Sequence, residues 1–193
     1  MTKMPNGTKV FVGGSRSLSR LNKDVKRRID NIIDKGFMVL LGDANGMDKA
    51  IQQYLHSRHY RKVVVFCMEG GARNNIGGWP TRTITAADPG RRDFAFYSTK
   101  DRSMVEEADY GFMLWDGRSR GTLTNVVHLV RRSKPILLYV APDKSFCTLL
   151  DAKDLFAILN HFDLAAIHKI DRELDLVATG SHSTRKVASA SLF

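Results

Sequence analysis

Lys9-Val10-Phe11-Val12-Gly13-Gly14-Ser15-Arg16 is the stretch that decides the fold, because an apolar run passes directly into two glycines. The apolar part predicts a buried strand, and the glycines predict a tight turn at its carboxyl end. A second stretch of this kind, Gly111-Phe112-Met113-Leu114-Trp115, runs into the turn Asp116-Gly117-Arg118-Ser119-Arg120-Gly121-Thr122. A segment with helical periodicity follows each turn. These two strand–turn–helix units indicate an α/β fold.

Further apolar runs alternate with amphipathic segments along the chain. In residues 21–33 apolar side chains recur every three or four positions, with Ser19 or Asn22 available as the N-cap and Gly36 as the terminating residue. Such alternation predicts an α/β, Rossmann-like three-layer sandwich with a mostly parallel sheet of about five strands. The other predicted strands are 37–41, 62–67 and 135–140, and the other predicted helices begin near Gly46, span 100–108, start at Thr122 and span 152–159.

The length of 193 residues and the hydrophobic share of 43% suit one globular domain. We expect a single domain over 1–193, with a core at about 8–140 and a C-terminal extension at 141–193 whose last dozen residues are frayed. No apolar run approaches the roughly 18 residues of a membrane span, and we therefore expect a cytoplasmic protein. Cys67 and Cys147 do not make a disulfide framework, and we expect both to be reduced and buried.

The formal net charge of +10 raises the question of nucleic-acid binding, because clustered Lys and Arg side chains neutralise phosphates. Residues 1–142 carry 24 of the 30 basic and 13 of the 20 acidic residues, so the excess positive charge belongs to the predicted core. A basic stripe interleaved with aromatic residues, or a reading helix, would make this interpretation more persuasive, and the sequence has neither. Nucleic acid is therefore the less favoured partner.

The two glycine-rich turns fall where ligands bind in this class of fold. In an open parallel sheet, ligands bind beyond the carboxyl ends of the strands at the point where the strand order reverses, which we expect between the two strands quoted above. Glycine allows a close approach to the backbone, and the helix starting near Gly121 and Thr122 offers free amides to a phosphate. Alternatively, the glycines only make tight turns. Two such turns at the switch point favour a phosphate- or nucleotide-binding cleft.

Four motifs follow one another in a distinctive order: VFVGGSRS (10–17), GDANGMDKA (42–50), DRSMVEEADYGFMLWDGRSRGTLTN (101–125) and KPILLYV (134–140). Over about residues 8–140 this order resembles the SLOG superfamily, the Rossmann-like group that includes the lonely-guy phosphoribohydrolases and DprA. It is also similar to the related nucleoside deoxyribosyltransferases and nucleotide N-glycosidases. The resemblance implies a nucleotide site. In the cleft we expect Gly13, Gly14, Ser15, Arg16, Asp43, Asp48, Gly117, Ser119, Gly121, Thr122 and Asn125, with Gly121 and Thr122 holding phosphate.

One departure from the family pattern bears on catalysis. The enzymes of this group commonly carry a glutamate three residues after the Gly-Thr threonine, where this chain has Asn125. A neutral amide is neither a carboxylate nucleophile nor a negative charge against an oxocarbenium centre. Asp116 is the first alternative catalytic carboxylate and Asp43 the second, although either could orient a ribose hydroxyl instead. Asp116 could also be an ordinary turn residue, and Asp48 could simply complement a helix dipole.

Other residues allow weaker hypotheses. Segment 69–96 is longer than most connections, which is typical of a functional or partly disordered loop. Its arginines could close over a phosphate or remain solvated, and we also expect it to be mobile when empty and ordered by an anionic ligand. The six histidines lack ligand spacing, and we expect no metal and no cofactor. The arginines of the segment are Arg73, Arg82, Arg91 and Arg92, and further cleft candidates are Tyr97, Lys100 and Asp101. Trp79 and Trp115 could stack on a base, although the preferred interpretation places Trp115 in the core.

The sequence thus predicts binding of a nucleotide or another phosphorylated small molecule, with weak N-glycosidase or deoxyribosyltransferase-like activity left open. Binding is slightly favoured over catalysis. A basic module that binds nucleic acid without catalysis is the alternative, and an interaction domain with a vestigial cleft is the third. A homo-oligomer is also left open.

Overall fold

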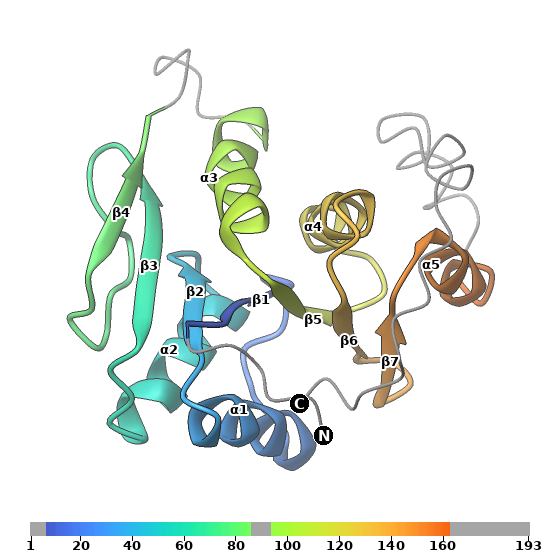
Figure 1. Ribbon diagram of the computed structural model, residues 1–193, viewed down its shortest axis with the longest axis horizontal. Helices are drawn as coiled ribbons and strands as arrows, with labels where there is room; N and C mark the ends of the chain where they lie inside the picture. The colour runs from blue at the N-terminus through green and yellow to red at the C-terminus, as the bar shows by residue number, and fades with distance from the viewer. Residues whose placement is uncertain (1–6, 86–93, 163–193) are drawn as a thin grey trace.

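The computed structural model describes residues 7–85 and 94–162. Within these ranges seven strands form one sheet in the order β4-β3-β2-β1-β5-β6-β7 (Figure 1). The α/β, mostly parallel architecture predicted from the sequence is confirmed, with two strands more than expected. The strands are β1 (Lys9–Gly14), β2 (Met38–Gly42), β3 (Val63–Met68), β4 (Thr81–Ile84), β5 (Tyr110–Trp115), β6 (Ile136–Val140) and β7 (Ser145–Leu149).

All neighbouring strands are parallel except β6 and β7, which are antiparallel. The chain builds outward from β1 through β2 and β3 to β4, and then returns to place β5 on the other side of β1. The strand order therefore reverses between β1 and β5, as the sequence predicted. Phe11 pairs with Gly111 and Gly14 pairs with Leu114 across this junction, so both strands end at the same edge of the sheet.

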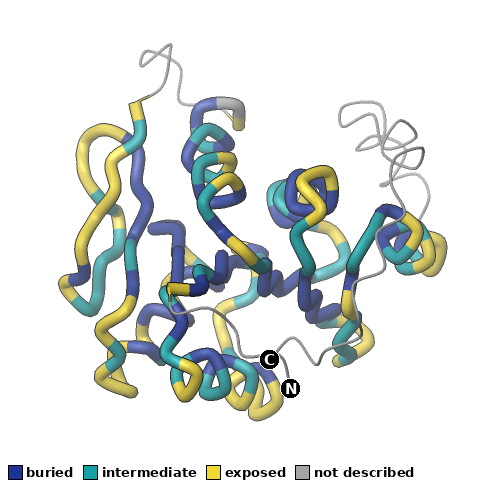
Figure 2. The backbone as a smooth tube through the Cα atoms, in the orientation of Figure 1, coloured by how far each residue is buried: buried dark blue, intermediate teal, exposed yellow. Residues whose placement is uncertain are grey.

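Helices cover both faces of the sheet (Figure 1). On one face lie α1 (Lys23–Asp34) and α2 (Met47–Ser57), and on the other lie α3 (Phe94–Glu107), α4 (Arg120–Arg131) and α5 (Ala152–Leu159). The buried side chains form one large cluster on each side of the sheet. The backbone of the central strands is coloured as buried in Figure 2. The apolar strand runs are buried on both faces, which explains why they lack an alternating pattern. None of the helices in the described ranges is long and apolar enough to span a membrane.

Local signals fix where the elements begin and end. The Asn22 side chain caps α1 by accepting a hydrogen bond from the Val25 amide at 2.8 Å. After α1 the chain turns at Gly36, whose φ of +66° is a left-handed conformation that glycine adopts easily. Gly111 lets α4 pack closely on β5, because a Cβ there would lie 2.5 Å from a Leu129 methyl carbon. Helix α3 begins at Phe94, six residues before the start predicted from the sequence.

Candidate functional site

A pocket of about 530 Å³ opens at the carboxyl ends of β1 and β5. Its walls come from the turn after β1, the first turn of α2, one side of α3, and the turn that leads from β5 into α4. The volume lies in the range of small-molecule sites. Nine of the residues predicted from the sequence line it together: Gly13, Gly14, Arg16, Asp48, Asp116, Ser119, Gly121, Thr122 and Asn125.

Three predicted site residues do not line this pocket: Ser15, Asp43 and Gly117. Ser15 is fully buried beneath it, where its hydroxyl donates to Asp116 at 3.0 Å and contacts the Thr122 hydroxyl at 3.2 Å. Ser15 therefore ties the turn after β1 to the turn after β5. The close junction also requires Gly14, because a Cβ there would lie 2.6 Å from the Leu114 carbonyl oxygen.

The first turn of α4 faces the pocket. The N-cap is Ser119 and not Thr122, contrary to the sequence prediction. The Ser119 hydroxyl oxygen accepts hydrogen bonds from the Thr122 amide at 3.4 Å and from the Thr122 hydroxyl at 3.1 Å. Thr122 lies in the first turn of the helix instead. The first amides of a helix have no partner within it, and the helix dipole makes this end attractive to anions. Gly121 and Arg120 lie at this end and both line the pocket.

Asp116 organises the turn between β5 and α4. Its carboxylate accepts hydrogen bonds from the Ser15 and Ser17 hydroxyls and from the amides of Arg118, at 3.0 Å, and Ser119, at 2.7 Å. Burial raises the pKa of Asp116, but these hydrogen bonds outweigh burial and hold it below the ordinary value. The carboxylate is thus ionised and occupied by four donors. Its catalytic role remains a prediction, and the contacts fit a residue that positions the turn.

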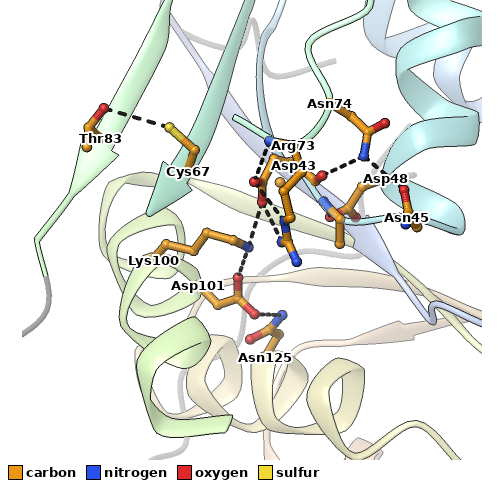
Figure 3. Close-up of polar contacts among 12 residues, drawn as sticks. Asp43, Asn45, Asp48, Cys67, Arg73, Asn74, Thr83, Lys100, Asp101 and Asn125 are labelled. Carbon is orange, nitrogen blue, oxygen red and sulfur yellow. Dashed lines mark hydrogen bonds and ion pairs between the residues drawn. The ribbon is translucent and has the colours of Figure 1, made fainter. Parts of the chain in front are cut away.

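Asp43 lies behind the pocket in an ion pair with Arg73 (Figure 3). The guanidinium donates to both carboxylate oxygens, at 2.7 and 3.0 Å, and the Arg73 amide adds a third hydrogen bond at 3.1 Å. Burial raises the pKa of Asp43, but Arg73 and the charge of Lys100 together lower it below its usual range. The Arg73 side chain is therefore bound to Asp43 in this structure.

We define the buried polar cluster as Asp48, Lys100, Asp101 and Asn125, which line one wall of the pocket (Figure 3). Asp48 and Lys100 are buried, and Asp101 and Asn125 are half-buried. Lys100, with only 5% of its side chain exposed, donates to Asp101 at 2.7 Å, and the Asn125 amide donates to the other Asp101 oxygen at 3.3 Å. Asp48 accepts a hydrogen bond from the Ala44 amide at 3.2 Å. Gly42 provides the space for it, because a Cβ there would lie 2.4 Å from an Asp48 oxygen.

The carboxylates of this cluster differ in their environments. Burial is the main cause that raises the pKa of Asp48, to about 6, and the charges of Asp101 and Asp43 add to the shift while Lys100 opposes it. Burial lowers the pKa of Lys100, but Asp101 and Asp48 outweigh burial and raise it. Lys100 is therefore charged, and the pKa of Asp48 lies close to neutral pH. Lys100 and Asp101 do face the cleft, as the sequence analysis suggested.

Aromatic side chains and arginines meet at the outer part of the pocket. Arg16 lies over the Tyr97 ring at 5.7 Å, and Arg120 lies over the Phe94 ring at 4.2 Å. Gly46 lets the turn before α2 reach Arg16, because its φ is +79° and a Cβ there would lie 2.1 Å from the Arg16 carbonyl oxygen. Phe94 was not among the site residues predicted from the sequence, because no pattern marks the first residue of α3.

Several other sequence hypotheses are settled by the packing. Trp79 is buried and donates its indole N–H to the Tyr60 carbonyl at 2.8 Å, so it is not available for base stacking. Trp115 is likewise a core residue, as the preferred interpretation had it. Arg82 forms an ion pair with Glu107. Arg91 and Arg92 lie outside the described residues, as do the segment 86–93 and the final dozen residues.

The cysteines and histidines provide no metal centre in the part of the chain that the structure describes. Cys67 is buried, with its sulfur 3.7 Å from the Thr83 hydroxyl. Cys147 is only half-buried, contrary to the sequence prediction, because β7 is the edge strand of the sheet. Both thiols are free.

Comparison with known proteins gives a likeness to solved structures and none to a described family. No protein-family model and no curated protein matches the chain. DNA processing protein A from Helicobacter pylori, studied for its single-stranded DNA binding mode, superposes with a TM-score of 0.52 and 15% sequence identity, over 91% of this chain and 82% of that chain. At this identity the likeness shows a shared fold. The SLOG resemblance read from the sequence remains a prediction beyond that shared fold.

Proposed function

We propose that this chain binds a nucleotide, or a nucleotide-derived phosphate ester, in the pocket between β1 and β5. The observation that carries the proposal is the first turn of α4, which opens into the pocket at Gly121 with Arg16 and Arg120 beside it. A helix N-terminus and two guanidinium groups favour an anion, and a glycine there allows phosphate to approach the backbone. Thr122 supplies a further hydroxyl at the same end.

The inner wall suits the sugar of such a ligand. Asp48, Asp101 and Asn125 all line the pocket and carry oxygen atoms that accept hydrogen bonds from hydroxyl groups. Asn125 follows Thr122 by about one helical turn, so a phosphate at the start of α4 leaves the sugar near the buried polar cluster. The charges thus separate along the pocket, with arginines at the outer part and carboxylates within.

Cleavage of the base from the sugar remains a finer hypothesis on the same site. The cluster offers two carboxyls in unlike environments, Asp48 with its raised pKa and Asp101 bound by Lys100 and Asn125. Pairs of this kind are typical of acid–base chemistry at glycosidic bonds. Asp48 accepts one hydrogen bond, from the Ala44 amide, whereas the oxygens of Asp116 accept four. A cytoplasmic location and a homo-oligomeric state also remain predictions.

A second candidate function is binding of single-stranded nucleic acid. The net charge of +10 and the fold shared with a protein studied for single-stranded DNA binding favour it. A polyanion would be held mainly through its phosphates, and its affinity would fall steeply with salt. A single nucleotide held in a preformed pocket would be much less sensitive to salt.

The test is a thermal-shift and calorimetric screen of nucleoside mono-, di- and triphosphates and a 5′-phosphorylated oligonucleotide, at two salt concentrations. We expect a mononucleotide to bind and to stabilise the protein by about 2.7 kcal/mol at a hundred times its Kd. Gly121→Val should remove this effect, whereas the surface variant Arg27→Ala should keep it. Binding of the oligonucleotide alone, with steep salt dependence, would favour the second candidate. Binding of neither would contradict both.

A further inference from the structure

Phe94 is the only large hydrophobic side chain that is exposed in the ranges 7–85 and 94–162, with a relative accessibility of 41%. It lines the same pocket as Gly121 and Asp101. A lone exposed aromatic residue is ordinary on a protein surface. Inside a polar pocket it presents an apolar, planar face to whatever enters.

The ring lies directly beside the first turn of α4. A Cβ built on Gly121 would come 3.9 Å from Phe94 Cε2, and it would meet no other heavy atom within 4 Å beyond its chain neighbours and its own helix backbone. The guanidinium carbon of Arg120 lies 4.2 Å from the centre of the Phe94 ring. The aromatic ring, a planar cation and the start of α4 therefore occupy one small region of the pocket.

Tyr97 does not offer an equivalent surface. Its ring already contacts two guanidinium groups, with Arg16 at 5.7 Å and Arg73 at 4.9 Å, and it meets the edge of Phe96 at a centroid distance of 5.2 Å. Arg73 is in turn held by Asp43. Phe94 is the most exposed aromatic side chain that lines the pocket, since Tyr97 is half-buried and Phe11 is buried.

We propose that Phe94 and Arg120 form a stacking platform for an aromatic base, so that the pocket selects nucleoside phosphates over sugar phosphates. Bases stack on aromatic rings and on guanidinium planes, and the face of any base is suitable. The inference rests on the proposed function, because it places the base of the ligand whose phosphate lies at Gly121. In a nucleotide one sugar separates the phosphate from the base. The Phe94 ring lies within that span of Gly121, at the start of α4.

The experiment compares ligands that differ only in the base, using adenosine 5′-monophosphate, cytidine 5′-monophosphate and ribose 5-phosphate in isothermal titration. We expect both nucleotides to bind more tightly than ribose 5-phosphate, by roughly five- to 150-fold if stacking contributes its usual share. Phe94→Leu, which keeps an apolar side chain but has no ring, should bring nucleotide affinity close to that of ribose 5-phosphate. Its affinity for ribose 5-phosphate should fall much less than its affinity for the nucleotides, because that ligand has no base to stack.

Two further variants serve as matched controls. Phe94→Trp keeps an aromatic face and should preserve the preference for nucleotides. Arg120→Lys keeps the positive charge but has no planar group, so it should weaken nucleotide binding more than ribose 5-phosphate binding. Unfolding of each variant is measured in parallel, and Phe94→Leu should match the wild type because the side chain is exposed.

The outcomes separate this inference from the function on which it rests. Equal affinity of the wild type for ribose 5-phosphate and the two nucleotides would overturn the stacking platform and leave phosphate binding intact. An equal loss of affinity for all three ligands in Phe94→Leu would also overturn it. Failure of all three to bind the wild type would contradict the proposed function itself.

Discussion

Arg73 is held to Asp43 by three hydrogen bonds, two from its guanidinium at 2.7 and 3.0 Å and one from its own amide at 3.1 Å. The carboxylate has 3% of its side chain exposed and the guanidinium 39%. This pair fastens the segment after β3 to the end of β2, directly behind the pocket. Both residues had looked like ligand contacts from the sequence, and in the structure they contact each other.

The ion pair allows a first prediction about stability. Replacing Arg73 by Met leaves a buried carboxylate with one amide donor and the more distant Lys100, at 3.9 Å. Loss of one partner of a buried pair is costly, but the exposure of Arg73 reduces the effect, so we expect a loss of about 1–3 kcal/mol in the free energy of unfolding. Arg27→Met is the control, because it breaks an exposed pair with Asp24 and should cost under about 0.5 kcal/mol. Chemical denaturation measures both, and equal losses would contradict the prediction.

The buried Asp48 predicts a pH dependence of stability. Its pKa is about 6 in the folded protein and 3.8 in the reference state, so the folded protein binds more protons between these values than the unfolded chain does. The contribution of Asp48 is therefore fully present below about pH 4 and is lost as the pH rises through 6. Asp48→Asn lacks this loss and should be more stable than the wild type at pH 7.5 by about 2–3 kcal/mol.

Denaturation of the two proteins at pH 4 and pH 7.5 tests this sign. The difference in unfolding free energy should be small at pH 4 and should favour the variant at pH 7.5. A difference that is the same at both values would show that burial and the charge of Lys100 cancel at Asp48, and one that favours the wild type only at pH 7.5 would show that Lys100 outweighs burial. Asp154→Asn is a suitable control, because that carboxylate lies on α5, away from the pocket.

Sequence patterns predicted the layers of the fold because buried parallel strands and amphipathic helices are encoded locally. The run from Lys9 to Arg16 and the turn after Trp115 were enough to indicate the switch point between β1 and β5. Strand β4 escaped prediction since Thr81, Arg82 and Thr83 are exposed and show no buried face. Its pairing with β3 is a tertiary contact that no local period encodes.

The site was predicted in outline and missed in detail for a related reason. Glycines reveal close approaches of the backbone, and Gly13, Gly14 and Gly121 do line one pocket. The hydrogen-bond donors that surround each carboxylate come from residues far away in the sequence, such as Ser15 for Asp116. The accessible ring of Phe94 likewise depends on where α3 crosses the start of α4. Such pairings become visible only when the helices are in place.

Two glycines of the pocket should respond differently to substitution. A Cβ at Gly14 would lie 2.6 Å from the Leu114 carbonyl oxygen, so Gly14→Ala should lower the free energy of unfolding by about 1–3 kcal/mol. A Cβ at Gly121 meets only Phe94, at 3.9 Å, and Gly121→Val should therefore fold normally. It should nonetheless lose nucleotide binding, because the side chain fills the space through which phosphate reaches the amides. Undiminished binding by Gly121→Val would move the phosphate away from this helix end.

Asn125 decides between a binding protein and an enzyme. Its amide donates a hydrogen bond to Asp101 at 3.3 Å, so this neutral side chain supports another carboxylate. The resemblance to SLOG enzymes predicts a glutamate at this position if the chain were a hydrolase. We expect the wild type to bind adenosine 5′-monophosphate and to release adenine at or near the uncatalysed rate. Chromatography of the free base measures this rate.

Asn125→Glu would place a second negative charge against Asp101, and it should weaken nucleotide binding by about 1 kcal/mol, roughly fivefold in Kd. It would gain base release only if Asp48 and Asp101 supply the remaining groups. Asn125→Ala separates the two effects, because it removes the hydrogen bond without adding charge, and it should bind more tightly than the glutamate variant. Rapid base release by the wild type that persists in Asp116→Asn but disappears in Asp101→Asn would assign catalysis to the buried polar cluster and would overturn the expectation of a protein that only binds.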